Sequence, residues 1–302
     1  MRYSSAVLAF AIVTALGIPQ AHAGFTLGDA ANFAALYEGN GGHNLNFNNS
    51  NVTGNIGIGG TGGFAGNGPG TITGTVEFFA GNAGQFSNSG LTITGGATFN
   101  NANVQATLNS LNLLSQTLGG EAGTSLVFNG GGSVNASAGT LDGSGNRVFT
   151  ATINSNFTAG TTFTITGTGS QTVVFNIPST GGHGFNGSIV LAGGITSDQV
   201  LFNFDAGNYA TLSGGDTLTI STNGNTTTGT FLDPNGNIQI NHSVLLGRIF
   251  GGDSHDMAIV SGANIIDPPR VPEPGSLALL AAGLVALGAI RRLRRPAKRS
   301  ET

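Results

Sequence analysis

The side chains that could carry out chemistry are few and thinly spread along this chain. The most suggestive group is Ser254, His255 and Asp256, three residue types that form hydrolytic triads. Neighbouring residues of an extended strand point in alternate directions, so three consecutive residues cannot relay a proton. The segment also lacks the strand-turn-helix setting of an activated serine. It is more typical of a turn, and we expect no catalytic residue and no enzyme activity.

Metal ligands are equally scattered. Cysteine is absent, which excludes disulfides, thiolate metal sites and thiol nucleophiles. The histidines His43, His183, His242 and His255 lack the short paired spacing of a zinc site. Loops beginning at Asp142 and Asp233 alternate oxygen ligands, but the twelfth position of an EF-hand would fall on Ile153 and Val244 instead of glutamate. We expect β-turns there, with bound calcium as the alternative, and no metal or cofactor is predicted.

The beginning of the chain has the pattern of a secretory signal peptide. Arg2 precedes a short apolar run over residues 6–18, and small residues, Ala21 and Ala23, stand at positions −3 and −1 of a cleavage site after Ala23. The apolar run is too short for a first transmembrane helix. We therefore predict a signal peptide over 1–23 and an exported chain that begins at Gly24.

The end of the chain has three parts that together indicate a membrane stop. A proline-rich linker over 267–275 contains Val271, Pro272, Glu273, Pro274 and Gly275. An apolar stretch over 276–290 follows, and an α-helix of that length rises roughly 22 Å, somewhat less than the hydrocarbon core of a bilayer. The basic tail over 291–302, with Arg291, Arg292, Arg294 and Arg295, is then expected on the cytoplasmic side. The body before it would lie outside the cytoplasm.

This three-part tail resembles the PEP-CTERM sorting signal, also known as the ice-binding protein C-terminal domain. The resemblance rests on the Val271 to Gly275 motif, the apolar run and the arginines, and covers about a tenth of the chain. It implies that an exosortase-type membrane enzyme cuts near Pro-Glu-Pro and releases the protein or re-anchors it at the cell surface. The alternative is a plain C-terminal anchor helix.

The exported part is acidic and low in charge. Between Gly24 and Arg270 three arginines face twelve aspartates and glutamates, a net charge of −9. Such a body repels phosphate backbones, which argues against nucleic-acid binding. With 39% hydrophobic residues the chain is not of disordered type, and its exported part is long enough to bury a core.

Short β-branched segments recur along the chain and indicate a mainly β fold. Three similar segments, 52–56, 72–76 and 93–97, have central glycines 20 and 21 residues apart. This period suits an irregular β-solenoid (β-helix), whose coils bury one another's inward side chains. We interpret 45–99 as three coils. Eleven further short strands are expected between residues 126 and 260, and glycines 18 apart at Gly229 and Gly247 predict a closing pair of coils.

One long helix interrupts the β pattern. Val104, Leu108, Leu111, Leu114 and Leu118 lie at helical spacing and form a single apolar stripe. Asn101 or Asn103 can cap its start and Gly119-Gly120 can end it. A helix with one apolar face must cover an apolar surface, so we expect it to pack alongside the solenoid. A second, shorter helical turn is expected from Asp29.

The body over 24–266 resembles a degenerate ice-binding-like or choice-of-anchor adhesin domain. The resemblance rests on residues 27–34, 53–57, the helix and the segments that begin at Gly229 and Gly247. It implies an irregular β-helix with one long helix alongside. The chain departs from a good ice binder because its Thr-x-Thr pairs are scattered: Thr71/Thr73, Thr92/Thr94, Thr162/Thr164 and Thr217/Thr219.

The sequence thus favours an exported, adhesin-like surface or matrix protein that engages extracellular polysaccharide and performs no catalysis. Ice binding through threonine-rich faces is the alternative, and threonine is also simply a favoured strand residue. A polysaccharide lyase or hydrolase on a β-helix would need acids clustered in one groove, whereas the acids here are spread along the chain.

Overall fold

The structure is a computed structural model that describes residues 24–81, 85–178, 183–204, 217–234, 236–252 and 255–268. These residues belong to one compact unit, Ala23–Pro269. The predicted signal peptide, membrane helix and basic tail lie outside the described residues, as do Ala21, Ala23 and the Pro-Glu-Pro motif. Within the described ranges, no helix is both long enough and apolar enough to cross a membrane.

The chain forms short strands, four 3-10 turns and one α-helix over the described residues. The first half contains η1 (Gly28–Asn32), β1 (Phe33–Tyr37), η2 (Asn40–Gly42), β2 (Asn44–Asn48), β3 (Asn51–Thr53), β4 (Asn55–Ile58), β5 (Gly63–Asn67), β6 (Thr71–Ile72), β7 (Val76–Phe78), β8 (Phe86–Ser89), β9 (Thr92–Ile93), β10 (Ala97–Thr98) and α2 (Ala102–Gly119). The second half contains β11 (Thr124–Phe128), β12 (Ser133–Asn135), η4 (Ala136–Ala138), β13 (Thr140–Leu141), β14 (Asn146–Ile153), β15 (Thr162–Thr166), β16 (Thr172–Asn176), β17 (His183–Gly184), β18 (Ser188–Ala192), η5 (Ser197–Gln199), β19 (Val200–Asn203), β20 (Thr217–Ile220), β21 (Thr226–Asp233), β22 (Asn237–Asn241), β23 (Val244–Gly251), β24 (Met257–Val260) and β25 (Asn264–Ile266).

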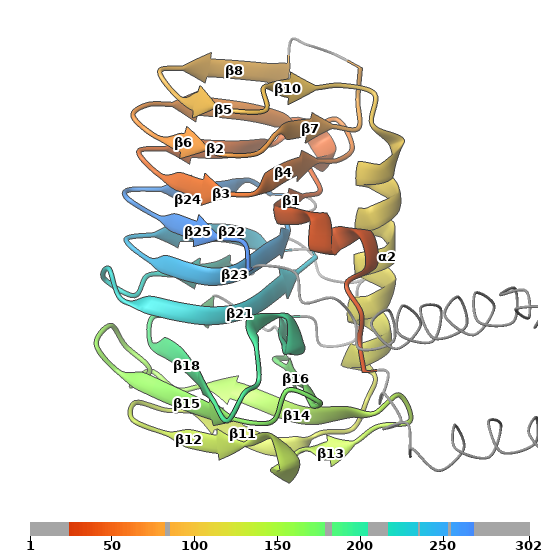
Figure 1. Ribbon diagram of the computed structural model, residues 1–302, viewed down its shortest axis with the longest axis vertical. Coiled ribbons are helices and arrows are strands. Elements are labelled where there is room, and N and C mark those ends of the chain that lie inside the picture. Colours follow the sequence, from red (N-terminus) through yellow and green to blue (C-terminus); the bar gives the residue numbers. More distant parts are fainter. Residues whose placement is uncertain are drawn as a thin grey trace, which may run out of the picture. The chain divides into compact units, whose positions relative to one another are not determined.

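The strands stack as the coils of a β-helix. They form a 15-stranded, a seven-stranded and a three-stranded sheet, and the one antiparallel pair among the described strands is β13 with β14. In the first run each coil contributes three short strands, β2, β3 and β4 in one coil and β5, β6 and β7 in the next (Figure 1). The expected mainly β solenoid is therefore present.

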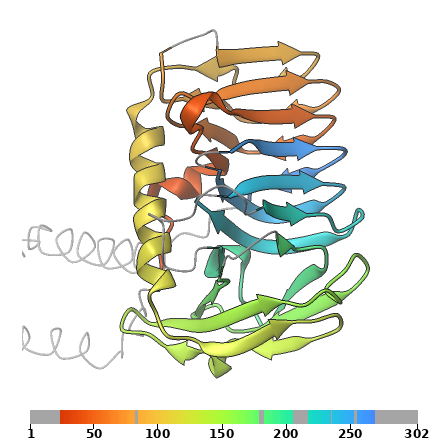
Figure 2. The same cartoon turned by 180° about the vertical axis from the view of Figure 1, so that it is seen from behind.

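The chain builds this stack in two runs that meet in its middle. The first run coils from β1 to β10, and α2 then returns along the side of the stack to its other end, where β11 starts the second run (Figure 2). The second run ends against the first: β23 pairs with β1, β24 with β2, and β25 with β3. The glycine-spaced segments predicted as a closing pair of coils do pair, Gly229 opposite Gly247, but they lie inside the stack.

The three repeated segments form adjacent coils in register, as their spacing predicts. Val52 lies opposite Ile72, which lies opposite Ile93. One strand further along, Ile56 lies opposite Val76, which lies opposite Ala97. All six side chains point into the core, so each coil covers the apolar side chains of the next.

Phenylalanine fills the core of the second run. Phe149, Phe175, Phe202 and Phe231 occupy one register column, and successive ring centroids lie 5.2, 5.2 and 4.7 Å apart with nearly parallel planes. Phe128 and Phe185 meet this column edge-on. Such offset and edge contacts stabilise aromatic pairs beyond their buried area, and they give a cysteine-free chain a core that needs no disulfide.

The long helix α2 matches its predicted range and covers one flank of the stack. The side chain of Asn101 caps its first turn by accepting a hydrogen bond from the Asn103 amide, 3.1 Å away. Its apolar stripe packs on outward-facing side chains of the 15-stranded sheet, among them Leu36, Leu201 and Phe250. The Asn203 side chain, fully buried, donates to the Ser115 carbonyl at 3.0 Å and so fastens the helix to β19.

The segment before the first coil differs from the expected helical turn. Residues 28–32 form the 3-10 turn η1 with Leu27, not Asp29, at its N-cap, and residues 33–37 are the fully buried strand β1. Its Phe-Ala-Ala-Leu-Tyr sequence carries no β-branched residue, so local propensity does not reveal it. It is a strand because β4 and β23 lie on its two sides.

Candidate functional site

One side of the seven-stranded sheet presents a regular surface. Inward residues of β20, β22, β24, β2, β5 and β8 are mostly buried and apolar, and outward ones are half-buried or exposed. Figure 1 shows β8, β5, β2, β24 and β22 stacked in this order. We call the outward-facing side chains of these six strands the flat face.

Small uncharged side chains occupy the flat face in two parallel rows. The registers give a first row of Thr219, Gln239, Ala258, Asn46, Ala65 and Ser87. They give a second row of Asn241, Val260, Asn48, Asn67 and Ser89. Neighbouring strands lie roughly 4.8 Å apart and the two rows about 6.6 Å apart, so the face repeats in two directions without a charge in either row.

The flat face is continuous across the junction of the two runs. The Asp256 carboxylate, at the margin of the face, accepts a hydrogen bond from the Asn44 amide at 2.8 Å and one from Asn46 Nδ2 at 3.4 Å. His43 Nδ1 lies 3.5 Å from the same carboxylate. These contacts join β2 to the residue before β24, so strands from opposite ends of the sequence share one surface.

The predicted threonine pairs divide among three surfaces. Thr71/Thr73 and Thr92/Thr94 lie on adjacent coils of β6 and β9, and Asn51/Thr53 on β3 extends them to a small threonine ladder. The other two pairs lie elsewhere, Thr162/Thr164 on β15 and Thr217/Thr219 on β20. Sequence spacing alone does not show that two of the four pairs are neighbours.

The threonine ladder spans fewer strands than the flat face, and some of its side chains already bond to the protein's own backbone. Asn51 Oδ1 accepts from the Thr71 amide and Thr73 Oγ1 accepts from the Gly54 amide, each at 3.1 Å. In the next strands, β25 and β23, aliphatic Ile266 and Leu246 interrupt it. The flat face is therefore the larger candidate surface.

Of the residues considered for catalysis and metal binding, the structure brings His43, His255 and Asp256 close together. Ser254 lies outside the described residues, and Asp256 bonds to Asn44 and Asn46 as given above. His255 stacks on His43 with ring centroids 6.2 Å apart. Over the described ranges, no three histidine, aspartate or glutamate side chains are grouped as a metal site would require.

The acidic loop at Asp142 is a hydrogen-bonded turn. Asp142 Oδ1 accepts from the amides of Ser144 and Asn146, at 2.9 and 2.7 Å, and Oδ2 accepts from the Asn146 side chain. These bonds close a turn, as expected of an aspartate that needs no bound ion. Asp233 is buried at the end of β21.

Comparison with known proteins supports both resemblances seen in the sequence. The family model of the PEP-CTERM protein-sorting motif matches residues 270–295. No curated protein matches the chain. Among solved structures, the ice-binding protein LeIBP from an Arctic yeast is similar at 17% identity and a TM-score of 0.51, over 82% of this chain and 95% of that one. A glycosylated form of LeIBP is similar at 18% identity and a TM-score of 0.50, over 82% and 96%.

These findings show the fold and the sorting signal. The chain carries a PEP-CTERM motif at 270–295, which implies an exported protein processed at the membrane by an exosortase-type enzyme. Its body is an irregular β-helix with one helix alongside, and this fold is similar to that of LeIBP. At 17 to 18% identity, the similarity to these structures concerns the fold alone.

Proposed function

We propose that this protein is exported, acts at the cell surface or in the extracellular matrix without catalysis, and binds an ordered, uncharged surface through the flat face. Ice is the surface we favour. The observation that carries the proposal is the flat face itself, six strands with two in-register rows of small uncharged side chains.

A repeating face suits a repeating ligand. Because the rows are spaced by strand geometry, many weak contacts can form on a crystal at once, and each adds to a single binding event. Charged side chains would have to lose tightly held water on such a surface, and that loss is costly. Ala258, Ala65 and Val260 instead leave apolar area between the amides and hydroxyls. The shared fold with LeIBP adds support.

The test is ice affinity of the purified exported protein. We expect it to enter a slowly growing ice front and to produce thermal hysteresis. A protein of the same size without such a face is excluded from ice and serves as the control. Exclusion of this chain from ice, with no hysteresis, would remove the proposal.

Extracellular polysaccharide is the second candidate ligand, which would make the protein an adhesin. The flat face carries the amides of Asn46, Asn48, Asn67, Gln239 and Asn241. Amide groups both donate and accept hydrogen bonds and so match sugar hydroxyls. Co-sedimentation with a panel of insoluble polysaccharides distinguishes the two ligands: binding to one polysaccharide with no ice affinity would favour the adhesin.

A further inference from the structure

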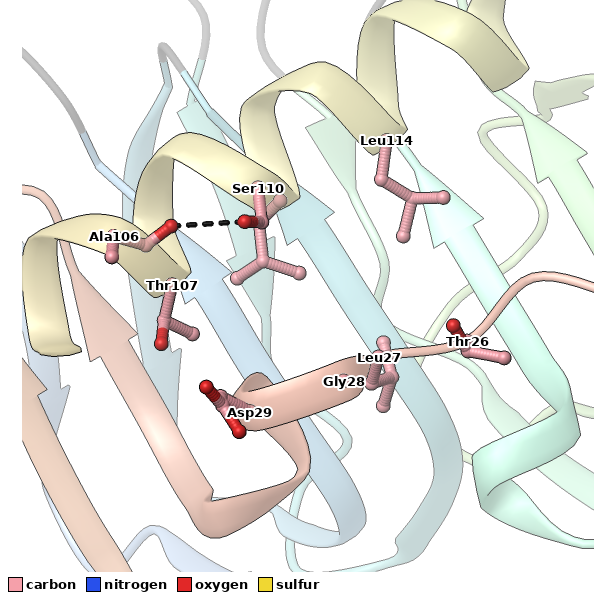
Figure 3. Close-up of a pocket in the computed structure, with 9 residues that line it drawn as sticks. Thr26, Leu27, Gly28, Asp29, Ala106, Thr107, Ser110 and Leu114 are labelled. Carbon is pink, nitrogen blue, oxygen red and sulfur yellow. Dashed lines mark hydrogen bonds between the residues drawn. The ribbon is translucent and has the colours of Figure 1, made fainter.

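A pocket of about 240 Å³ lies between the segment that precedes β1 and the helix α2 (Figure 3). Its apolar walls are Leu27, Leu111 and Leu114, and its polar groups include Asp29, Thr107 and Ser110. The pocket is separate from the flat face, which lies on another sheet. None of the interactions described above uses Asp29 or Thr107.

Thr107 is the unusual residue of this pocket. Its side chain is 4% exposed, and its hydroxyl has no hydrogen-bond partner within the described structure. Hydroxyls inside a helix commonly bond to the carbonyl four residues earlier. Ser110 does so to Ala106 at 2.9 Å and Thr117 to Leu113 at 2.8 Å. The Thr107 hydroxyl instead points into the pocket, where a ligand can satisfy it (Figure 3).

Asp29 supplies a negative charge opposite this hydroxyl. Its residue is exposed, and in the part of the chain that the structure describes its carboxylate makes no hydrogen bond or ion pair. Gly28 precedes it at φ 51°, a conformation that glycine adopts readily, and the turn directs Asp29 toward α2. The Asp29 carboxylate and the Thr107 hydroxyl thus lie on facing sides of a space with leucine walls, and Ser110, whose hydroxyl donates to Ala106, lines the same pocket.

We propose that this pocket binds a small hydroxylated primary ammonium, of the chemical class of an amino sugar. The ammonium has three donors and no acceptor, which suits the Asp29 carboxylate and the Thr107 oxygen. The hydroxyl groups of such a ligand can bond to Ser110, and its apolar ring face can pack on the leucines. A neutral sugar has no positive charge to pair with the Asp29 carboxylate. A purely apolar ligand would leave the Thr107 hydroxyl without a hydrogen bond.

The experiment measures glucosamine binding to the full chain in mild detergent by saturation-transfer NMR, with glucose and N-acetylglucosamine as neutral probes. We expect saturable binding of glucosamine in about the millimolar range, as suits so small a ligand, and none of the neutral sugars. Asp29→Asn should weaken binding at least about tenfold, and Thr107→Val, which keeps the shape and removes the hydroxyl, should weaken it several-fold. Glu121→Gln, which removes an exposed acid elsewhere, is the matched control and should bind as the unchanged chain does.

Several results would overturn the proposal. They are no saturable glucosamine binding, equal binding of glucose, or equal effects of Asp29→Asn and Glu121→Gln, which would indicate general attraction to an acidic body. Unchanged binding in Thr107→Val would likewise place the ligand outside this pocket. Thermal unfolding of each variant checks that the fold is kept.

Discussion

Arg248 Nη2 lies 2.7 Å from Asp267 Oδ1, and this ion pair joins β23 to the residue that follows the last strand. The Arg248 side chain is fully buried, and Asp198, in the turn η5 just before β19, bonds to the same guanidinium. Arg248 also donates to the Ala31 carbonyl at 3.3 Å. One side chain therefore holds the first turn, the second run and the end of the folded chain together.

Replacing Arg248 should weaken the fold strongly. Arg248→Ala leaves two carboxylates close together without their partner, and breaking a buried pair in this way costs about 3 kcal/mol or more. Arg147→Ala is the matched control, because Arg147 is half-buried near the other end of the stack and bonds only weakly to Gly139, at 3.4 Å; its cost should stay below about 1 kcal/mol. Urea unfolding measures both. Equal losses would show that the cluster contributes little.

The close contact of β21 and β23 predicts a second sensitive position. A β-carbon at Gly247 would lie 1.8 Å from the Gly229 carbonyl oxygen. Gly247→Ala must therefore push the two strands apart, with an expected loss of about 3 kcal/mol or more. At Gly143 a β-carbon meets nothing within 4 Å, so Gly143→Ala is the control and should be nearly neutral. A Gly247→Ala protein with unchanged thermal stability would contradict the observed packing.

The sorting motif gives a prediction about processing in cells. Changing Pro272, Glu273 and Pro274 together to alanine should block cutting, so that the full-length form accumulates in the membrane fraction. Immunoblots of membrane, surface and medium follow the two forms. The control replaces Lys298 and Arg299, which lie beyond the matched range 270–295. Normal processing of the triple variant would mean that the motif is not the signal.

Much of the fold follows from local pattern. The 20-residue repeat predicts which side chains stack, because each coil must bury its own inward residues against the next. The stripe from Val104 to Leu118 and the Asn101 cap predict α2, because both signals lie within one helix.

The meeting of the two runs could not be predicted from local pattern. Pairing of β1 with β23 joins residues more than 200 positions apart, and no local signal encodes it. The strand β1 was not predicted, because its strand conformation depends on this long-range pairing.

The residues of the candidate site could likewise not be grouped from the sequence alone. Threonine pairs are visible in the sequence, but their grouping depends on coil lengths that set the register. Asn46 and Ala258 share a row only because β2 and β24 pair. The flat face thus became visible only with the topology, whereas the sorting tail could be identified from a contiguous motif.

Thermal hysteresis of two matched tyrosine variants tests the central proposal most directly. Ala65→Tyr raises a bulky side chain in the first row of the flat face, and Thr73→Tyr does so in the threonine ladder on another side of the stack. We predict hysteresis in the unchanged protein and in Thr73→Tyr, and its near-complete loss in Ala65→Tyr. Hysteresis that survives in Ala65→Tyr, or is absent from the unchanged protein, would contradict ice binding through the flat face.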